Sequence, residues 1–343
     1  MTLPFISIIC PVYNEKEYIE KCICSILQQD YPKENIEILF VDGMSTDETR
    51  EIITKYSKEY SFLKLLDNPQ KIVPCAMNIG IQSAVGEVVI RLDGHCVYPP
   101  NYISSLVEYL YKLNADNVGG VWNILPANQT AEAQAVAIAS SHSFGVGNVA
   151  FRIGTTQIKE VDTVPFGCYK RKVFDKIGLF DEELIRNQDN EFNARLKNAG
   201  GKIYLIPDIT IDYYARSNIK KICSMYYQYS LFTPLVQQKL GKCDTWRRMI
   251  PTLFLIGLLL GGISCFIPAV PNVIKIAYLI IVASYGINSL FIGLQQSIKY
   301  KHWGLLYYLP VTFFCIHLTY GWAYIVGVYK IVTHSKFHAT INR

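Results

Sequence analysis

The sequence predicts an α/β fold with a mostly parallel sheet, followed by C-terminal transmembrane helices. Over the first 125 residues, short apolar runs alternate with segments of helical periodicity, the pattern of a doubly wound parallel sheet. Between Met249 and Arg343 there is no Asp or Glu, and long uncharged runs dominate. Such runs are typical of membrane segments, so the rest of the chain is expected to be a water-soluble domain.

The elements of the soluble domain follow in order. Apolar, β-branched runs predict strands over 5–12, 36–41, 62–66, 87–93 and 118–124, and helical periodicity predicts helices over 15–29, 45–60, 74–84 and 101–113. Ser45 and Glu48 have the spacing of a capping box, so the second helix is expected to begin there.

The second half of this domain is less regular. Residues 126–160, rich in Ala, Ser and Gly, predict a helix and then a mobile loop. The elements expected after Val161 are helices over 171–177 and from Asn187 to the Gly200-Gly201 stop, and strands over 202–207 and 210–214. We place the end of the domain at residue 215.

The rest of the chain is predicted to associate with a cell membrane. Apolar stretches over 250–270, 273–294 and 303–329 can each cross about 30 Å of hydrocarbon. Basic and aromatic residues over 216–248 predict interfacial helices, with packing on the soluble domain as the alternative, and 333–343 is a short basic tail.

Charge predicts a multi-pass protein whose soluble domain is cytosolic. Lys299 and Lys301 indicate a cytosolic loop, which agrees with two crossings from a cytosolic domain. A third crossing would place Lys330, Lys336 and Arg343 outside, against the positive-inside rule. Whether all three segments span is therefore open.

Composition excludes several classes of protein. Ten cysteines without a Cys-x-x-Cys pair argue against a zinc site or a disulfide frame, and Met1 leads straight into a strand, so no signal peptide is expected. The formal charge of +5 has its excess near the membrane segments. Positive-inside bias explains it better than a nucleic-acid partner, and we expect none.

Polar residues follow four of the predicted strands, at the edge where parallel α/β sheets bind ligands. They are Tyr13-Asn14-Glu15, Asp42-Gly43, Asp67-Asn68 and Asp93-Gly94-His95. Asp93 and His95 can both reach one divalent ion across a turn, and Gly94 would let a diphosphate approach the backbone. The alternative is that Asp-Gly simply turns the chain.

A second polar cluster, Asn187 to Glu191, opens a predicted helix. Acids at a helix start commonly act as caps and dipole partners. The alternative is that Asp189 or Glu191 is a general base.

The sequence resembles the glycosyltransferase family 2 enzymes, and within them the membrane-associated group that builds succinoglycan-type and other surface polysaccharides. The resemblance covers roughly residues 5 to 240. It is carried, in the family's order, by Pro11-Val12-Tyr13-Asn14-Glu15, Val41 to Asp47, Ala76 to Gly80, Arg91 to His95 and Asn187 to Glu191.

The resemblance implies a GT-A fold and transfer of a sugar, with inversion, from a nucleotide diphosphate donor. It places the donor nucleotide against Pro11, Tyr13, Glu15, Asp42, Asn78 and Asp93, with Asp42 on the base or ribose. Asp93 and His95 match the family's Asp-x-Asp motif, which implies Mg²⁺ or Mn²⁺. The imidazole suits Mn²⁺ better than Mg²⁺.

The resemblance also assigns Asp189 as the general base that deprotonates the acceptor, with Gln188 in place of the family's Glu. Glu191 is the rival base, roughly 200° further round the helix. Phe166, Gly167, Gln188 and Glu191 are expected on the side of the acceptor and donor sugar.

These features imply a hexosyltransferase-type enzyme that adds one sugar, from UDP by resemblance, to a polyprenyl-diphosphate-linked acceptor. The Gln-x-x-Arg-Trp motif of processive synthases is absent, and Trp246-Arg247-Arg248 is no equivalent. The family's second carboxylate after Asp42 is also missing, because Gly43 follows. The alternative is a non-catalytic, membrane-anchored scaffold that binds nucleotide sugars. A transporter is disfavoured by the lack of paired intramembrane charges.

Overall fold

The computed structural model describes residues 3–242 and 246–339, and the chain divides into two compact units. The first, the sheet unit, is formed by residues up to 123 and by 154–213. The second, the helical unit, is formed by 124–153 and by 214–339. The chain passes from the sheet unit to the helical unit between residues 213 and 214, and the segment 124–153 also belongs to the helical unit.

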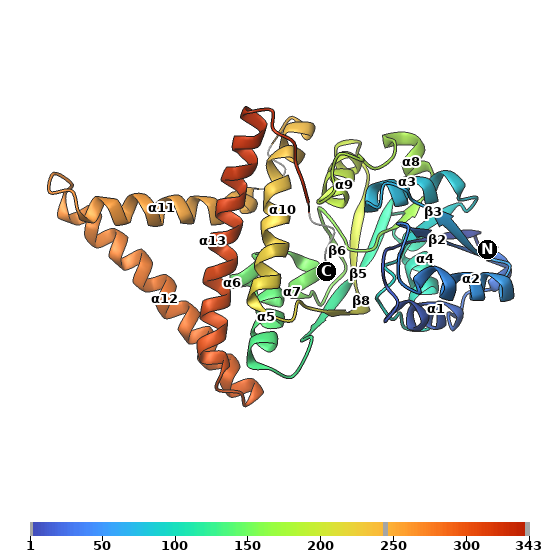
Figure 1. Ribbon diagram of the computed structural model, residues 1–343, viewed down its shortest axis with the longest axis horizontal. Coiled ribbons are helices and arrows are strands. Elements are labelled where there is room, and N and C mark those ends of the chain that lie inside the picture. The colour runs from blue at the N-terminus through green and yellow to red at the C-terminus, as the bar shows by residue number, and fades with distance from the viewer. Residues whose placement is uncertain (1–2, 243–245, 340–343) are drawn as a thin grey trace. The chain divides into compact units, whose positions relative to one another are not determined.

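The sheet unit is built on an eight-stranded sheet in the described residues, with the order β3-β2-β1-β4-β7-β5-β8-β6. Figure 1 shows this sheet with its helices. The strands are β1 (Ile6–Val12), β2 (Ile36–Asp42), β3 (Leu63–Asp67), β4 (Val88–Arg91), β5 (Asn117–Leu125), β6 (Lys159–Glu160), β7 (Cys168–Lys170) and β8 (Ile203–Tyr214). β1 to β4 are mutually parallel, whereas β7 runs antiparallel to β4 and β5. The predicted, mostly parallel sheet is therefore confirmed.

Helices pack on both faces of this sheet. They are α1 (Ile19–Leu27), α2 (Thr49–Glu59), α3 (Val73–Ser83), α4 (Tyr102–Lys112), α8 (Lys172–Ile177) and α9 (Gln188–Asn198), with a 3₁₀ turn η1 (Lys33–Asn35). The alternate residues Ile6, Ile8 and Cys10 of β1 share one core with α1, α2 and α4. Ile9 faces the other way, toward α3, where a Cβ on Gly80 would lie 2.5 Å from its Cγ2. The glycine of the Ala76 to Gly80 motif thus allows close helix packing.

Three predicted details of the sheet unit are wrong. α1 begins at Ile19 rather than at residue 15. α2 begins at Thr49 with Glu48 at its N-cap position and no side-chain cap, and Ser45 Oγ bonds to Asp42 and to the Asn14 N–H instead. The two strands expected around Pro207 are one strand, β8. Pairing with β6 covers only Tyr204 and Leu205, so Pro207 need not donate a hydrogen bond on that side.

A buried carboxylate at the opposite end of the sheet gives an acid-stability prediction. Glu37 on β2 accepts hydrogen bonds from Ser7 Oγ at 2.6 Å, the Val85 N–H at 2.8 Å and Lys64 Nζ at 3.0 Å. Burial raises its pKa, but these hydrogen bonds outweigh burial and lower the pKa below its usual value. The ionised form therefore stabilises the fold above the unfolded pKa of about 4.3.

We expect Glu37→Gln to be less stable than the wild type at neutral pH. The difference should narrow as the pH falls below about 4, because the wild type then loses its ionised carboxylate. Thermal unfolding of both proteins across this pH range measures the effect. A difference that stays constant at every pH would contradict the role of the carboxylate charge.

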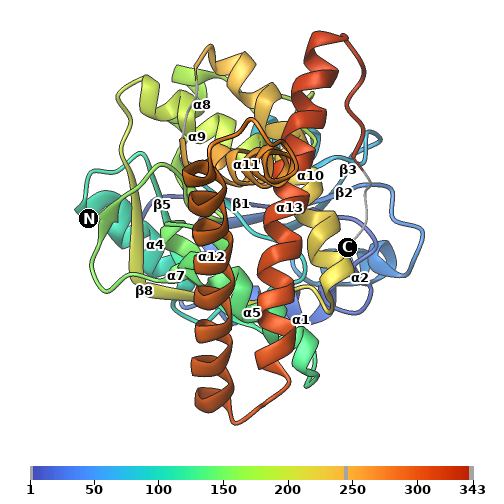
Figure 2. The same ribbon diagram turned by 90° about the vertical axis from the view of Figure 1, so that its left-hand side faces the viewer.

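The helical unit is organised around α13 (Leu305–Val332), which contacts α5, α10, α11 and α12 (Figure 2). The other members are α5 (Ala131–Ser141), α6 (Ser143–Val146), α7 (Ala150–Ile153), α10 (Ile219–Leu240), the 3₁₀ turn η2 (Trp246–Met249), α11 (Ile250–Cys265) and α12 (Asn272–Tyr300). The basic and aromatic region 216–248 thus contains one long helix, α10, packed on α13.

Three helices in the described residues are long and apolar enough to cross a membrane. They cover Trp246–Cys265, Asn272–Tyr300 and Leu305–Val332, with mean hydropathies of 1.7, 1.8 and 1.5. Only 6% and 11% of the first two are buried in the protein, against 39% of the third. The first two therefore present most of their apolar side chains outward, as helices surrounded by lipid do.

The expectation of a helix and then a mobile loop over 126–160 is wrong in its second half, since α6 and α7 follow α5. α5 is buried on most of its surface, including Ala135, Val136 and Ala139, and packs against α13. Small side chains allow this close approach without producing an apolar stripe. For this reason periodicity did not reveal that the segment belongs to the helical unit.

Candidate active site

The parallel strands bring the predicted polar residues of the sheet unit to one edge. In the register of β1, β2 and β3, Val12 pairs with Asp42, which pairs with Asp67. β4 lies on the other side of β1, with Arg91 opposite Ile9, and Asp93 follows two residues later. The carboxyl ends of four neighbouring strands therefore carry the candidate site, as expected for a parallel α/β sheet.

Asp42, at the end of β2, has a side chain that is 0% exposed. Its oxygens accept hydrogen bonds from the Ser45 N–H at 2.9 Å, Ser45 Oγ at 2.5 Å and Arg50 Nη1 at 2.6 Å. In this structure its carboxylate is thus committed to the protein. Direct contact with a base or ribose stays a prediction and requires one of these partners to move.

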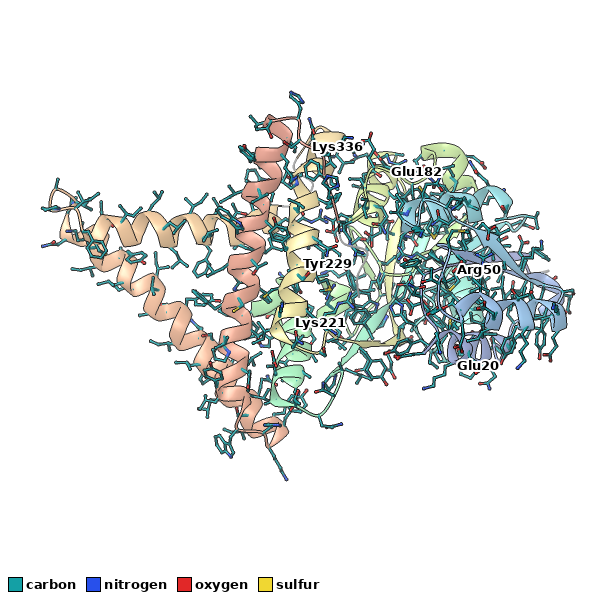
Figure 3. The ribbon with its side chains drawn as sticks, viewed as in Figure 1. Glu20, Arg50, Glu182, Lys221, Tyr229 and Lys336 are labelled. Carbon is teal, nitrogen blue, oxygen red and sulfur yellow. The ribbon has the colours of Figure 1, made fainter. Side chains whose placement is uncertain are left out.

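Arg50, labelled in Figure 3, lies on α2 and was missed by the sequence analysis. Its second nitrogen donates to Asp67 Oδ1 at 2.8 Å, so one guanidinium joins the ends of β2 and β3. Hydrogen bonds to Asp42 and Asp67 raise the pKa of Arg50 and keep it charged. A cation in the first turn of the helix that follows a strand-end carboxylate was the available sequence signal.

Hydrogen bonds tie the loop after β1 to the loop after β2. The Asn14 N–H donates to Ser45 Oγ at 2.8 Å, and Asn14 Oδ1 accepts from the Thr46 N–H at 2.9 Å. Tyr13 packs closely on Gly43, whose Cβ would lie 3.0 Å from Tyr13 Cδ2. Pro11 lies within β1, beside these loops in sequence. The residues of the first loop that are predicted to contact the nucleotide therefore form one fixed surface with the second loop.

Asp93 and His95 follow β4 and have different partners. Asp93 Oδ1 accepts from Arg91 Nη2 at 3.2 Å, and His95 Nδ1 lies 3.1 Å from Glu15 Oε1. The side chains of Asp93 and His95 are 19% and 25% exposed, so both are accessible. Gly94 is buried, and a Cβ there would lie 2.7 Å from Val12 Cγ1. Its missing side chain thus allows close packing against β1, and the approach of a diphosphate to this glycine stays a prediction.

A divalent cation fits this pair by the chemistry of its donors. Among the described residues, no three His, Cys, Asp or Glu side chains form a ready metal cage. One carboxylate and one imidazole remain at the end of β4, and Mg²⁺ or Mn²⁺ on a nucleotide commonly takes its other ligands from phosphate oxygens and water. Asp93 and His95 therefore suit a cation whose other ligands come from the phosphates of a bound nucleotide and from water.

Arg91, the last residue of β4, connects the two halves of the site. Besides its contact with Asp93, its guanidinium lies 5.9 Å from the centre of the Phe166 ring. Burial lowers the pKa of Arg91, but the charges of Asp93 and Asp189 outweigh burial and raise it. Asp189 is thus near enough to interact with Arg91. Arg91 belongs to the motif Arg91 to His95, but the motif did not predict a role for it.

Asp189 and Glu191 occupy the first turn of α9 but have different surroundings. Asp189 Oδ1 accepts only the neighbouring Asn190 N–H, at 2.9 Å, among its hydrogen bonds to described residues. Glu191 is 5% exposed, and its two oxygens accept from Arg195 at 2.5 and 2.9 Å. Arg195 also donates to the carbonyls of Ile177 and Leu179. Glu191 is therefore committed to holding α9 in place.

The remaining predicted residues are mostly buried. Phe166 and Gln188 are 6% and 7% exposed, and the Gly167 carbonyl accepts from the Arg91 N–H at 3.0 Å. The Asn78 side chain bonds both the N–H and the carbonyl of Phe180, at 2.9 Å each, and Glu182 at 2.8 Å. Asn78 thus fastens the turn after α8 to α3, and its predicted contact with a nucleotide stays a prediction.

Backbone strain also gathers at these loops. Eight described residues other than glycine have a positive φ, and five of them lie beside the residues above. These five are Asn14, Met44, Lys71, Phe166 and Asn187. Such conformations cost free energy and persist where the surrounding structure enforces them, which is common at functional sites.

Comparison with known proteins agrees with this geometry. The model of the family described as "Glycosyl transferase family 2" matches residues 7–178. A Methanococcus voltae protein, dolichyl N-acetyl-alpha-D-glucosaminyl phosphate 3-beta-D-2,3-diacetamido-2,3-dideoxy-beta-D-glucuronosyltransferase, is 33% identical over 77% of this chain and 84% of its own length. The succinoglycan biosynthesis protein ExoA of Rhizobium meliloti is 29% identical over 65% of this chain and 67% of its own length.

Among solved structures, the mannosyltransferase PcManGT from Pyrobaculum calidifontis, in complex with GDP-Man and Mn²⁺, aligns with a TM-score of 0.55. The alignment covers 93% of this chain and 87% of that chain at 17% identity. This likeness shows the fold alone, a GT-A fold. The family match and the relative in Methanococcus voltae show that this chain belongs to glycosyl transferase family 2 and is a glycosyltransferase.

Proposed function

We propose that this protein transfers one sugar, with inversion, from a UDP-sugar to a polyprenyl-linked saccharide at the membrane. The observation that carries the proposal is the arrangement around Arg91. This largely enclosed cation, 12% exposed, donates to Asp93 at 3.2 Å on the donor side of the strand edge, and the charge of Asp189 at the start of α9 helps to raise its pKa. One guanidinium thus feels a donor-side group and a candidate base for the acceptor, which supports a direct displacement between them.

On the donor side, the chain supplies both a cation and hydrogen-bond donors for a diphosphate. The buried Nε–H of Arg91 has no hydrogen-bond partner among the described residues, so it is available to an anionic oxygen. Asp93 and His95 would hold the divalent cation. When bound, that cation offsets the negative charge that the leaving diphosphate gains.

On the acceptor side, Asp189 takes the proton from the attacking hydroxyl. The hydroxyl oxygen forms a bond to the anomeric carbon as the bond to the diphosphate breaks on the opposite face, which inverts the configuration. Asp189 is favoured over Glu191 because both oxygens of Glu191 are occupied by Arg195. An occupied carboxylate accepts a proton only after losing that ion pair.

The acceptor is proposed from the helical unit and from one relative. That unit has three helices able to cross a membrane, and the Methanococcus voltae relative is named for a dolichyl phosphate-linked acceptor. We place the chain as a multi-pass membrane protein with its sheet unit in the cytosol. A polyprenyl chain in the cytosolic leaflet of the membrane would then present its saccharide to the sheet unit's side of the membrane.

Ligand binding by the full-length protein in detergent tests the donor. Thermal unfolding is followed with UDP, GDP and CMP, each with Mn²⁺, with Mg²⁺ or with EDTA, because a ligand of the folded state raises its stability. We expect a selective, metal-dependent rise with UDP. A rise with GDP alone would overturn the choice of nucleotide, and no rise with any nucleotide would contradict the donor site.

Transfer assays test the acceptor and the stereochemistry. Purified protein is given UDP-sugars with N-acetylglucosamine linked to a polyprenyl through one phosphate, linked through a diphosphate, or free in solution. We expect transfer to a lipid-linked acceptor, and a coupling constant at the new anomeric carbon that shows inversion. Equal transfer to the free sugar, or retention of configuration, would contradict the proposal.

A further inference from the structure

Glu15 and His95 form a pair whose geometry determines which nitrogen of the imidazole faces outward. Glu15 Oε1 lies 3.1 Å from His95 Nδ1, and the Glu15 side chain is 10% exposed. An ionised carboxylate can only accept hydrogen bonds, so Nδ1 carries the proton in this contact. The lone pair of the neutral ring is then on Nε2, the other nitrogen.

Hydrogen bonds fix the backbone of the two turns that carry Glu15 and His95. The Glu15 N–H donates to Thr49 Oγ1 at 2.8 Å, and its carbonyl accepts from Tyr18 and Ile19 at 2.9 and 2.8 Å. These bonds place Glu15 in the turn that begins α1. On the other side, Tyr98 Oη accepts from the Asp93 N–H at 2.8 Å and fixes the turn that carries His95. The contact therefore joins two fixed loops.

We propose that Glu15 is a positioning residue that orients His95 as an Nε2 ligand of the donor's cation, so that this site selects Mn²⁺ over Mg²⁺. The inference rests on the proposed function, because the cation is the one bound with the nucleotide diphosphate. A carboxylate behind a ligating histidine fixes its tautomer and orientation and raises its basicity. An imidazole ligand in turn favours Mn²⁺ over the oxygen-preferring Mg²⁺.

The charge of Glu15 also complements the neutral ligand at position 95. A histidine at position 95 brings one negative charge fewer than an aspartate would, and Glu15 supplies a carboxylate directly behind it. An aspartate at position 95 has no ring N–H for Glu15 to accept, so Glu15 could not orient it. The effect of Glu15 on Mn²⁺ binding should therefore be larger when residue 95 is His than when it is Asp.

A double-mutant cycle tests this directly. Mn²⁺ binding to full-length protein in detergent, with saturating UDP, is measured by the electron paramagnetic resonance of free Mn²⁺ in four proteins: wild type, E15Q, H95D and E15Q/H95D. We expect E15Q to weaken Mn²⁺ binding about 10- to 100-fold. We expect H95D to narrow the preference for Mn²⁺ over Mg²⁺, measured by Mg²⁺ competition. Adding E15Q to H95D should weaken Mn²⁺ binding much less than E15Q does in the wild type.

Glu17→Gln is the matched control, because it removes the same charge from an exposed residue of the same loop. It should leave Mn²⁺ binding near the wild-type value. Equal loss in E15Q and E17Q, unchanged Mn²⁺ affinity in E15Q, or equal weakening by E15Q in the wild-type and H95D backgrounds would each overturn the proposal.

A second measurement separates this role from the predicted contact of Glu15 with the nucleotide. UDP affinity in EDTA should be the same for wild type and E15Q, since the proposed role needs the metal. A loss of UDP affinity without metal would overturn the proposal in favour of a nucleotide contact. A wild type that binds no nucleotide under any condition would instead contradict the proposed function, so the two failures are distinguishable.

Discussion

Replacing Asp189 with Asn is expected to lower the rate of sugar transfer by about 10²- to 10⁴-fold, the usual contribution of a general base. The amide keeps the size of the side chain but cannot take the proton from the acceptor hydroxyl. Asp189 lies at the start of α9 and makes one hydrogen bond, to the next residue's N–H. The fold and the affinity for UDP should therefore change little.

Single-turnover transfer and equilibrium UDP binding are the measurements for this variant. Asp175→Asn, which removes the same charge from an exposed position on α8, is the control and should transfer at the wild-type rate. Wild-type turnover in the Asp189 variant would refute the base assignment. A matching loss of UDP affinity would instead place Asp189 on the donor.

Replacing Arg195 with Met is expected to destabilise α9 by about 3 kcal/mol, the lower part of the range for removing one partner of a buried ion pair. Glu191, 5% exposed, would keep its charge without a cation, whereas Arg195 itself is 27% exposed. The carbonyls of Ile177 and Leu179 would also lose a donor. Since α9 carries Asp189, transfer should fall as well.

Hydrogen exchange of the α9 peptides measures this loss, because it reports local opening. Lys197→Met on the same helix is the control, since its ion pair with Glu160 is exposed and should contribute less than about 1 kcal/mol. Adding Glu191→Gln to Arg195→Met should restore part of the stability by removing the unpaired charge. Equal effects of the Arg195 and Lys197 variants would contradict the structural role of the pair.

The sheet was predictable because its strands are locally encoded. β1 to β4 are apolar runs that end in polar residues, and each lies next to a helix with an apolar face. Alternation and helical periodicity act over a few residues, so a single sequence reveals them. The same local signals identified the three apolar helices of the helical unit, which need only length and hydropathy.

Local signals failed where two plausible partners compete. Ser45 has the spacing of a capping box with Glu48, yet its hydroxyl donates to Asp42 at 2.5 Å. The same hydroxyl accepts from the Asn14 N–H at 2.8 Å, so the loop after β1 takes the accepting role that a cap would need. The prediction for the segment that contains α5 failed for a different reason. Its alanines pack on α13 without an apolar stripe, so only the packed structure assigns it to the helical unit.

By itself, the sequence determined the mostly parallel sheet, the edge at which the polar residues gather, the membrane helices and the family resemblance. Each depends on the order of residue types along the chain. Only the tertiary structure decided which groups are paired: Arg50 with Asp42 and Asp67, Arg195 with Glu191, and Glu15 with His95, 80 residues away. Spacing along the chain leaves such pairs undetermined, because the distance between two loops is set by the strands that carry them.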